Sequence, residues 1–151
     1  MTERVIIVGA GHAAGQAAAS LRQKKYAGEI VIIGDEDFEP YQRPPLSKAY
    51  LAGDIGLEKL YFKPEGYYAK IDADLRLSTR VASIDRAAKT VTTVTTRGRE
   101  TLTYDKLILA TGSRVRELPI PGNDLDGVHY LRSIADVQAM QEEFAVGKKL
   151  V

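Results

Sequence analysis

Val5-Ile6-Ile7-Val8, followed directly by Gly9-Ala10-Gly11-His12-Ala13-Ala14-Gly15, is the stretch that decides the fold of this chain. The first four residues are apolar and β-branched and predict a buried strand. The glycine-rich residues lead into an Ala-rich segment, and residues 13–25 are expected to form a helix. A second apolar run, residues 30–33, ends at Gly34-Asp35-Glu36. Strand, glycine-rich turn, helix and strand in this order predict a βαβ unit that binds a dinucleotide.

Each position of the glycine-rich turn has a physical reason for its residue type. Gly9 permits a tight turn out of the strand, and Gly11 lets the backbone approach a pyrophosphate closely. Ala14 takes the third small position, where helix and strand pack against each other. The backbone N–H groups at the helix start, from His12 and Ala13 onward, are expected to face the phosphates together with the positive end of the helix dipole.

The acidic residues after the second strand predict how the nucleotide is held. Asp35 lies 21 residues after Ala14, close to the ~20 residues at which an acid is expected to bind an adenosine ribose. Its carboxylate can accept hydrogen bonds from ribose hydroxyls, whereas it would repel a 2′-phosphate. We expect the neighbouring Glu36 to contribute less.

Composition narrows the class of protein. The formal net charge of +1 gives no indication of a nucleic-acid or membrane partner. No apolar run approaches the ~18 residues of a membrane-spanning helix, and no signal peptide precedes the first strand, so a cytoplasmic protein is expected. The chain has no cysteine, which excludes redox-active cysteine pairs and thiolate metal sites within it. His12 and His129 lie far apart without ligand spacing, so no metal site is predicted.

The remaining chain is expected to continue as an α/β fold with a parallel, Rossmann-like sheet and an antiparallel β-meander. Strands are expected at 75–77, leading to 79–81, at 90–96 and 100–104 around a turn at 97–99, and, buried, at 107–109. Residues 40–62 are expected to be irregular apart from a short helix at 46–51, and another short helix is expected at 64–70. A last helix is expected at 133–145, capped by Ser133 and Asp136, with Ile134, Val137, Met140 and Phe144 facing inward.

One nine-residue segment carries a family resemblance. Pro40-Tyr41-Gln42-Arg43-Pro44-Pro45-Leu46-Ser47-Lys48 resembles the arginine-proline-proline-leucine-serine-lysine motif of oxygenase-coupled ferredoxin reductases, the putidaredoxin-reductase, rubredoxin-reductase and biphenyl-dioxygenase-reductase type. The glycine motif and Ala110-Thr111-Gly112-Ser113 fit the same family. The resemblance covers essentially the whole chain and implies that the bound dinucleotide is FAD.

The motif residues have chemistry suited to a flavin. Consecutive prolines hold the loop extended, so it can lie along a planar ring with little entropy to lose. Arg43, beside Pro44, offers a planar donor fork for pyrophosphate or ribose oxygens. The resemblance implies that Lys48 lies near the flavin N5 edge, where a cation favours the reduced anionic ring.

The resemblance implies further contacts and a boundary. Val81 resembles the residue whose backbone contacts the adenine edge, and Ala110, Thr111 and Gly112 resemble a loop over the adenosine and pyrophosphate. Residues 1–146 are then expected to form the FAD-binding half-domain. Residues 147–151, which look like the approach to another strand, are expected to begin an NAD(P)H-binding domain.

The implied activity belongs to a longer parent protein. Such a reductase takes a hydride from NAD(P)H onto FAD and passes electrons singly to a small iron–sulfur protein, ferredoxin or rubredoxin. Two alternatives stay open: the FAD half of a flavin-dependent oxidase or monooxygenase, and a non-catalytic FAD-binding module.

Overall fold

A computed structural model describes residues 2–144, 147 and 149 of the chain. These divide into two compact units, which are described separately. The first comprises Met1–Tyr41 and Tyr61–Gly112, and the second comprises Gln42–Leu60 and Ser113–Val151. The residues predicted to begin a further domain, 147–151, lie mostly outside the described part, so that boundary stays a prediction.

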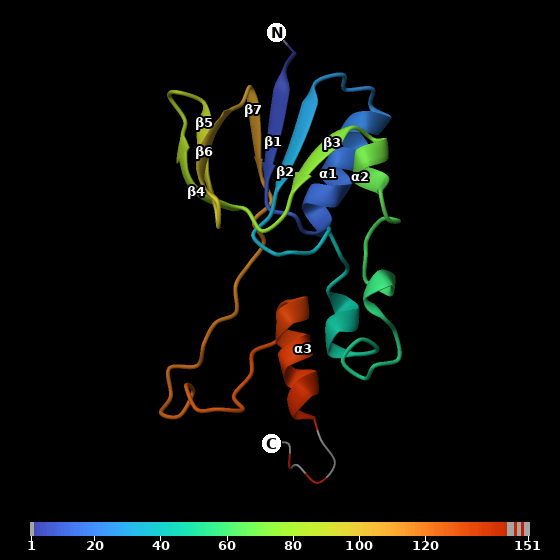
Figure 1. Cartoon of the computed structure of the whole chain (residues 1–151), viewed down its shortest axis with the longest axis vertical. Helices are drawn as coiled ribbons and strands as arrows, with labels where there is room; N and C mark the ends of the chain where they lie inside the picture. The colour runs from blue at the N-terminus through green and yellow to red at the C-terminus, as the bar shows by residue number, and fades with distance from the viewer. Residues whose placement is uncertain (1, 145–146, 148, 150–151) are drawn as a thin grey trace. The chain divides into compact units, whose positions relative to one another are not determined.

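A parallel sheet of four strands forms the centre of the first unit (Figure 1). Its strands are β1 (Arg4–Val8), β2 (Glu29–Ile33), β3 (Ala73–Arg76) and β7 (Lys106–Leu109), in the order β3-β2-β1-β7. Helix α1 (His12–Gln23) connects β1 to β2 and confirms the expected βαβ unit. The four-residue helix α2 (Tyr67–Lys70) precedes β3.

Each face of this sheet is covered by a different layer. Alternate side chains of β1 and β2 pack against α1 and α2, as in the cluster of Val5, Ile7, Ile30 and Ile32 with Ala14, Ala18 and Tyr68. The intervening side chains pack against the antiparallel strands, as in the cluster of Ile6, Val8, Val31 and Ile33 with Val91, Leu102 and Tyr104. Because both faces of β1 and β2 are buried, these two strands are continuously apolar over residues 5–8 and 30–33, as is typical of parallel sheets.

The predicted β-meander is present as a separate three-stranded sheet. Its strands β4 (Arg80–Asp85), β5 (Thr90–Thr95) and β6 (Gly98–Thr103) are antiparallel in the order β4-β5-β6. The turn between β5 and β6 lies one residue earlier than predicted. Gly98, with φ 132°, already begins β6 opposite Thr95.

Several expected elements differ in detail from the structure. The strand expected at 107–109 forms, but it is not fully buried: Leu109 is 63% exposed. Among the described residues β7 pairs only with β1, and an edge strand has a neighbour on one side only. The strand expected at 75–77 starts earlier, at Ala73. The short helix expected at 64–70 begins only at Tyr67, after Gly66 in the left-handed conformation.

The second unit contains short helical turns and one longer helix. A 3-10 turn η1 (Pro44–Ser47) replaces the helix expected at 46–51, and a second turn η2 (Leu57–Lys59) follows. Helix α3 (Ile134–Glu143) has the expected capping box: Asp136 N–H donates to Ser133 Oγ, and Ser133 N–H donates to Asp136 Oδ2. Ile134 and Val137 are buried as predicted. Phe144 does not face inward; it follows the last turn of α3 and is 45% exposed.

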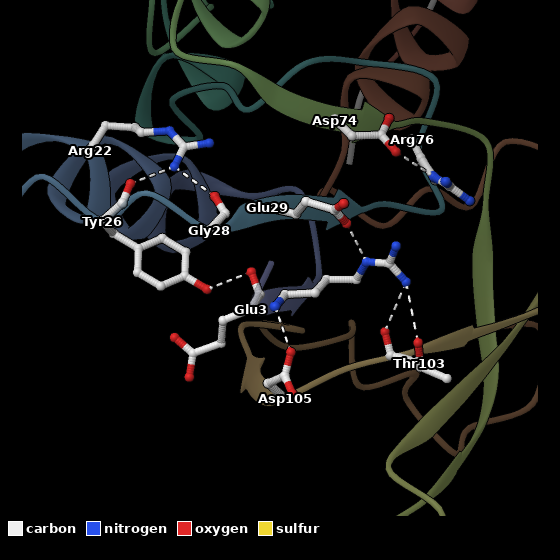
Figure 2. A network of polar contacts seen from close by, with 10 residues as sticks. Glu3, Arg22, Tyr26, Gly28, Glu29, Asp74, Arg76, Thr103 and Asp105 are labelled. Carbon is white, nitrogen blue, oxygen red and sulfur yellow. Dashed lines mark hydrogen bonds and ion pairs between the residues drawn. The ribbon is translucent and has the colours of Figure 1, made fainter. Parts of the chain in front are cut away.

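Polar contacts link residues at the amino ends of the strands of the parallel sheet (Figure 2). The backbone N–H of Arg4 donates to Asp105 Oδ2 at 2.7 Å, and its guanidinium pairs with Glu29 at 2.5 Å and donates to Thr103 O at 3.2 Å. Tyr26 Oη donates to Glu3 O at 3.1 Å. These contacts lie at the amino ends of β1 and β2.

Among the described residues, none of the helices has both the length and the apolar composition that a membrane span needs.

Candidate dinucleotide-binding site

The loops that follow β1, β2 and β7 meet at the carboxyl edge of the parallel sheet. The glycine motif follows β1, the acidic turn of Asp35 and Glu36 follows β2, and residues 110–112 follow β7. All of these belong to the first unit. Open parallel sheets bind ligands at this edge, so the fold brings the predicted residues of the first unit to a suitable position.

The backbone conformation and the packing at position 9 both require a glycine. Its φ is 106°, a conformation that L side chains rarely adopt, and a Cβ atom there would lie 2.2 Å from Ala110 O. Its N–H donates to Ile33 O at 2.7 Å, while Ala110 N–H donates to Val8 O at 2.7 Å. The turn therefore lets the ends of β1, β2 and β7 approach one another closely.

At position 11, by contrast, neither the backbone conformation nor the packing requires a glycine. Its φ of −92° suits any residue, and a Cβ atom there would meet no protein atom within 4 Å. Gly11 precedes α1, whose N-terminus has no side-chain cap and no acidic residue in its first turn. The backbone N–H groups that begin at His12 and Ala13 therefore have no capping side chain, and no acidic side chain of the first turn compensates the helix dipole, next to the open space at Gly11. This space suits a diphosphate, whose approach a Cβ atom would hinder.

Ala14 and Gly15 fill tightly packed positions on α1. Ala14 is fully buried in the cluster between α1 and the sheet. A Cβ atom on Gly15 would lie 2.5 Å from Tyr68 Oη, 3.1 Å from Pro40 Cβ and 3.2 Å from Phe62 Cδ1. The sequence interpretation assigned no role to Gly15, because its neighbours come from a segment about 25 to 50 residues further along the chain.

The side chain of His12 belongs to an aromatic cluster. Its ring lies 4.0 Å from the Phe62 ring, centroid to centroid, at an interplanar angle of 41°. Lys63 Nζ lies 4.5 Å from the Phe62 centroid and 5.2 Å from the Tyr67 centroid. His12 therefore offers the candidate site its backbone, while its imidazole packs at a tilt against the Phe62 ring.

The acidic turn is held from two sides. Gly34 N–H donates to Arg76 O at 2.9 Å, and Thr79 N–H donates to Gly34 O at 2.8 Å. Asp35 is exposed, whereas Glu36 is half-buried and its Oε2 accepts a hydrogen bond from Tyr41 Oη at 2.6 Å. The sequence interpretation did not identify Tyr41, because nothing in a single sequence relates a tyrosine to an acid five residues before it.

Burial raises the pKa of two groups in the first unit, Tyr68 and Glu39. Burial raises the pKa of Tyr68, with a further increase from Glu39, and the hydroxyl of Tyr68 has no hydrogen-bond partner among the described residues. Burial also raises the pKa of Glu39, with a smaller increase from Glu65. Tyr68 therefore stays neutral and adds no negative charge near the helix start.

The other predicted residues of the first unit are half-buried or exposed. Val81, half-buried in β4, pairs with Thr93 next to a β-bulge between Val81 and Ser83. Ala110 is half-buried, and Thr111 and Gly112 are exposed, with Gly112 at φ 68°. The contacts with adenine and pyrophosphate that the resemblance implies for these residues stay predictions.

Three predicted residues belong to the second unit and are described there on their own. Arg43 is half-buried, and its Nη1 donates a hydrogen bond to the backbone carbonyl of Arg132. Part of its donor fork therefore anchors the segment before α3. Pro44 begins η1, and Lys48 ends it, with its side chain exposed and its N–H bonded to Pro45 O at 3.0 Å.

Comparison with known proteins identifies relatives over nearly the whole chain. The family model described as pyridine nucleotide-disulphide oxidoreductase matches residues 3–151. A probable ferredoxin reductase, CtmF, of Castellaniella defragrans is 47% identical over 98% of this chain and 36% of its own length. A rubredoxin-NAD(+) reductase of Ectopseudomonas oleovorans is 42% identical over 97% of this chain and 37% of its own length.

A solved structure supports the same relationship. The ferredoxin reductase for the CYP199A2 system from Rhodopseudomonas palustris superposes with a TM-score of 0.85 and 42% identity, covering 93% of this chain and 34% of that one. The chain therefore spans about a third of the length of the relatives that it matches. The disulphide chemistry in the family's description has no counterpart among these 151 residues, which include no cysteine.

Proposed function

Because the chain belongs to the pyridine nucleotide-disulphide oxidoreductase family, we propose that it is the FAD-binding part of an NAD(P)H-dependent reductase. The observation that carries this proposal is the open space in front of Gly11, at an α1 N-terminus without side-chain cap or acid. Neither the backbone conformation nor the packing of the protein requires a glycine at position 11, and the N–H groups at the start of α1 have no capping side chain. Both features suit a bound diphosphate.

In this proposal the first unit holds the ADP part of FAD. The backbone from Gly9 to Ala14 accommodates the pyrophosphate, and Asp35 accepts hydrogen bonds from the adenosine ribose, with Glu36 in a lesser role. The backbone of Val81 contacts adenine. Ala110, Thr111 and Gly112 contribute backbone beside the adenosine and pyrophosphate.

Residues of the second unit are assigned on the family resemblance. Arg43 offers guanidinium donors to pyrophosphate or ribose oxygens, Pro44 holds the loop extended, and Lys48 places a positive charge beside the ring. When bound, FAD supplies the capacity to accept two electrons and release them one at a time. Lys48 would stabilise negative charge on the ring, and the rigid prolines would hold that charge at a fixed position.

The activity of the whole protein is part of the same proposal. It takes electrons from NAD(P)H and passes them singly to a small iron–sulfur protein, ferredoxin or rubredoxin, in the cytoplasm, often for an oxygenase. Reductases of ferredoxin and of rubredoxin among the relatives support this acceptor class. Residues 1–146 would be the FAD-binding portion, with an NAD(P)H-binding domain beginning at 147–151.

The test is to identify the bound cofactor and the electron acceptor. The complete protein should purify yellow and release FAD on denaturation, and NADH or NADPH should bleach the flavin. Reduced protein should pass electrons to ferredoxin or rubredoxin much faster than to oxygen.

A colourless protein that binds NADH would contradict the assignment of FAD. Rapid oxidation by oxygen alone would favour an oxidase or monooxygenase, and bound FAD that NAD(P)H does not reduce would favour a non-catalytic module.

A further inference from the structure

We propose that Tyr41 is a positioning residue for the nucleotide: its hydroxyl fixes Glu36 and thereby presets the acidic turn that receives the adenosine ribose. The inference rests on the proposed function, because it assumes that the acidic turn binds a ribose. It adds a residue that has no place in the glycine motif and no direct contact with the ligand.

Hydrogen bonds hold the backbone of the acidic turn at several points. Besides the two bonds of Gly34, Ser78 N–H donates to Glu36 O at 3.0 Å, and Ser78 Oγ donates to Asp37 Oδ1 at 2.9 Å. The backbone on both sides of Asp35 is therefore tied to the segment that follows β3. What these bonds leave unspecified is the direction of the two carboxylates that precede Asp37.

The hydrogen bond from Tyr41 fixes the direction of one of these carboxylates, that of Glu36. Its length of 2.6 Å from Tyr41 Oη to Glu36 Oε2 is that of a strong hydrogen bond to a charged acceptor. Tyr41 itself cannot move freely, because it is 2% exposed, forms a β-bridge with Tyr61 and lies edge-on to Phe38 with ring centroids 6.4 Å apart. A rigid donor therefore fixes the carboxylate of Glu36.

Fixing Glu36 has a consequence for Asp35. Two adjacent carboxylates repel each other, and the bond from Tyr41 holds the carboxylate of Glu36 in one direction beside Asp35. With Glu36 bound to Tyr41, the exposed Asp35 carboxylate remains in place for the ribose. A preset turn loses less conformational entropy when the nucleotide binds. Removal of the tyrosine hydroxyl should therefore weaken only those contacts that involve ribose hydroxyls.

The test compares ADP with 2′,3′-dideoxy-ADP, which has the same base and phosphates but neither ribose hydroxyl. Titration calorimetry on the flavin-free chain should show that Tyr41→Phe raises the Kd for ADP by about three- to tenfold, the effect of one hydrogen bond. The Kd for dideoxy-ADP should not change. A merely structural role of Tyr41 would weaken both ligands equally, and that result would overturn the inference.

Two further variants complete the experiment. In a Glu36→Ala background, Tyr41→Phe should cause no additional loss of ADP affinity, because the hydroxyl acts through the carboxylate of Glu36. Tyr26→Phe is the matched control, since it removes a tyrosine hydroxyl bond to Glu3 O in the same unit; it should leave both constants unchanged. Additive losses, or an unchanged Kd for ADP in Tyr41→Phe, would overturn the role of Tyr41 and leave the proposed function standing. Failure of the unmodified chain to bind ADP would instead contradict the proposed function, and this inference with it.

Discussion

The hydroxyl oxygen of Tyr68 lies 2.5 Å from the position that a Cβ atom on Gly15 would occupy. A methyl group at this position would have to displace Tyr68, which is 3% exposed, and would also crowd Pro40 and Phe62. We expect Gly15→Ala to lower the free energy of unfolding by about 1–3 kcal/mol, the usual cost of overpacking. Urea denaturation, followed by circular dichroism, measures this difference.

The Tyr68→Phe background tests the cause. This variant removes the hydroxyl, for which the described part of the chain offers no hydrogen-bond partner, so by itself it should be neutral or slightly stabilising. In this background Gly15→Ala should cost less than in the original chain, although Pro40 at 3.1 Å and Phe62 at 3.2 Å remain. An equal cost in both backgrounds would show that Tyr68 is not the limiting contact.

Gly11 should behave in the opposite way. Gly11→Ala places a methyl group in open space at an ordinary φ of −92°, so its effect on unfolding should stay within about 0.5 kcal/mol. Binding of FAD or ADP should nevertheless weaken by more than tenfold, because the methyl group separates the backbone from the diphosphate. Titration calorimetry on the folded variant measures this. Unimpaired binding would contradict the position assigned to the diphosphate.

Gly11 could be assigned a role from the sequence alone, whereas Gly15 could not. The order of strand, glycine motif, helix and strand predicted the βαβ unit, and the Thr- and Val-rich residues predicted the antiparallel strands, because both patterns are local. Gly15 and Tyr41 depend on contacts with Tyr68 and Glu36 that no local pattern encodes. The exposure of Leu109 likewise depends on the strand order, which places β7 at an edge among the described strands.

Asp35 and Glu36 should differ in their contribution to FAD binding. Asp35→Ala is expected to weaken FAD retention by about 1–3 kcal/mol, the cost of removing a charged hydrogen-bond acceptor. Glu36→Ala should cost less, because that carboxylate is already bonded to Tyr41. Flavin content after exhaustive dialysis provides the measurement. Equal loss in the two variants would show that Asp35 has no special role with the ribose.

Arg22 should matter for stability and not for the nucleotide. Its guanidinium donates to the carbonyls of Ile71, Tyr26, Gly28 and Asp72 at 2.6–2.8 Å. Arg22→Ala leaves these acceptors without that donor and should lower the free energy of unfolding by about 2–3 kcal/mol. Arg22→Lys should recover only part of the loss, because an ammonium cannot reproduce the planar fork. Lys24→Ala, at an exposed position nearby, is the control and should change stability by less than about 0.5 kcal/mol.

The last prediction tests whether Lys48 acts on the flavin or is an ordinary exposed charge. Lys48→Met keeps most of the side-chain stem and removes the charge, which separates electrostatics from packing. In the complete, flavin-loaded protein we expect a lower flavin reduction potential and slower reduction by NADH. A tenfold slower reduction would correspond to about 1.4 kcal/mol of lost transition-state stabilisation. FAD affinity should change little, because Gly11 and Asp35 hold the other part of the molecule in our proposal. Lys59→Met removes an exposed lysine of η2 in the same unit and is the matched control; it should change neither quantity. A potentiometric titration and stopped-flow reduction at equal flavin loading decide the question, and identical behaviour of the two variants would show that Lys48 is only solvated.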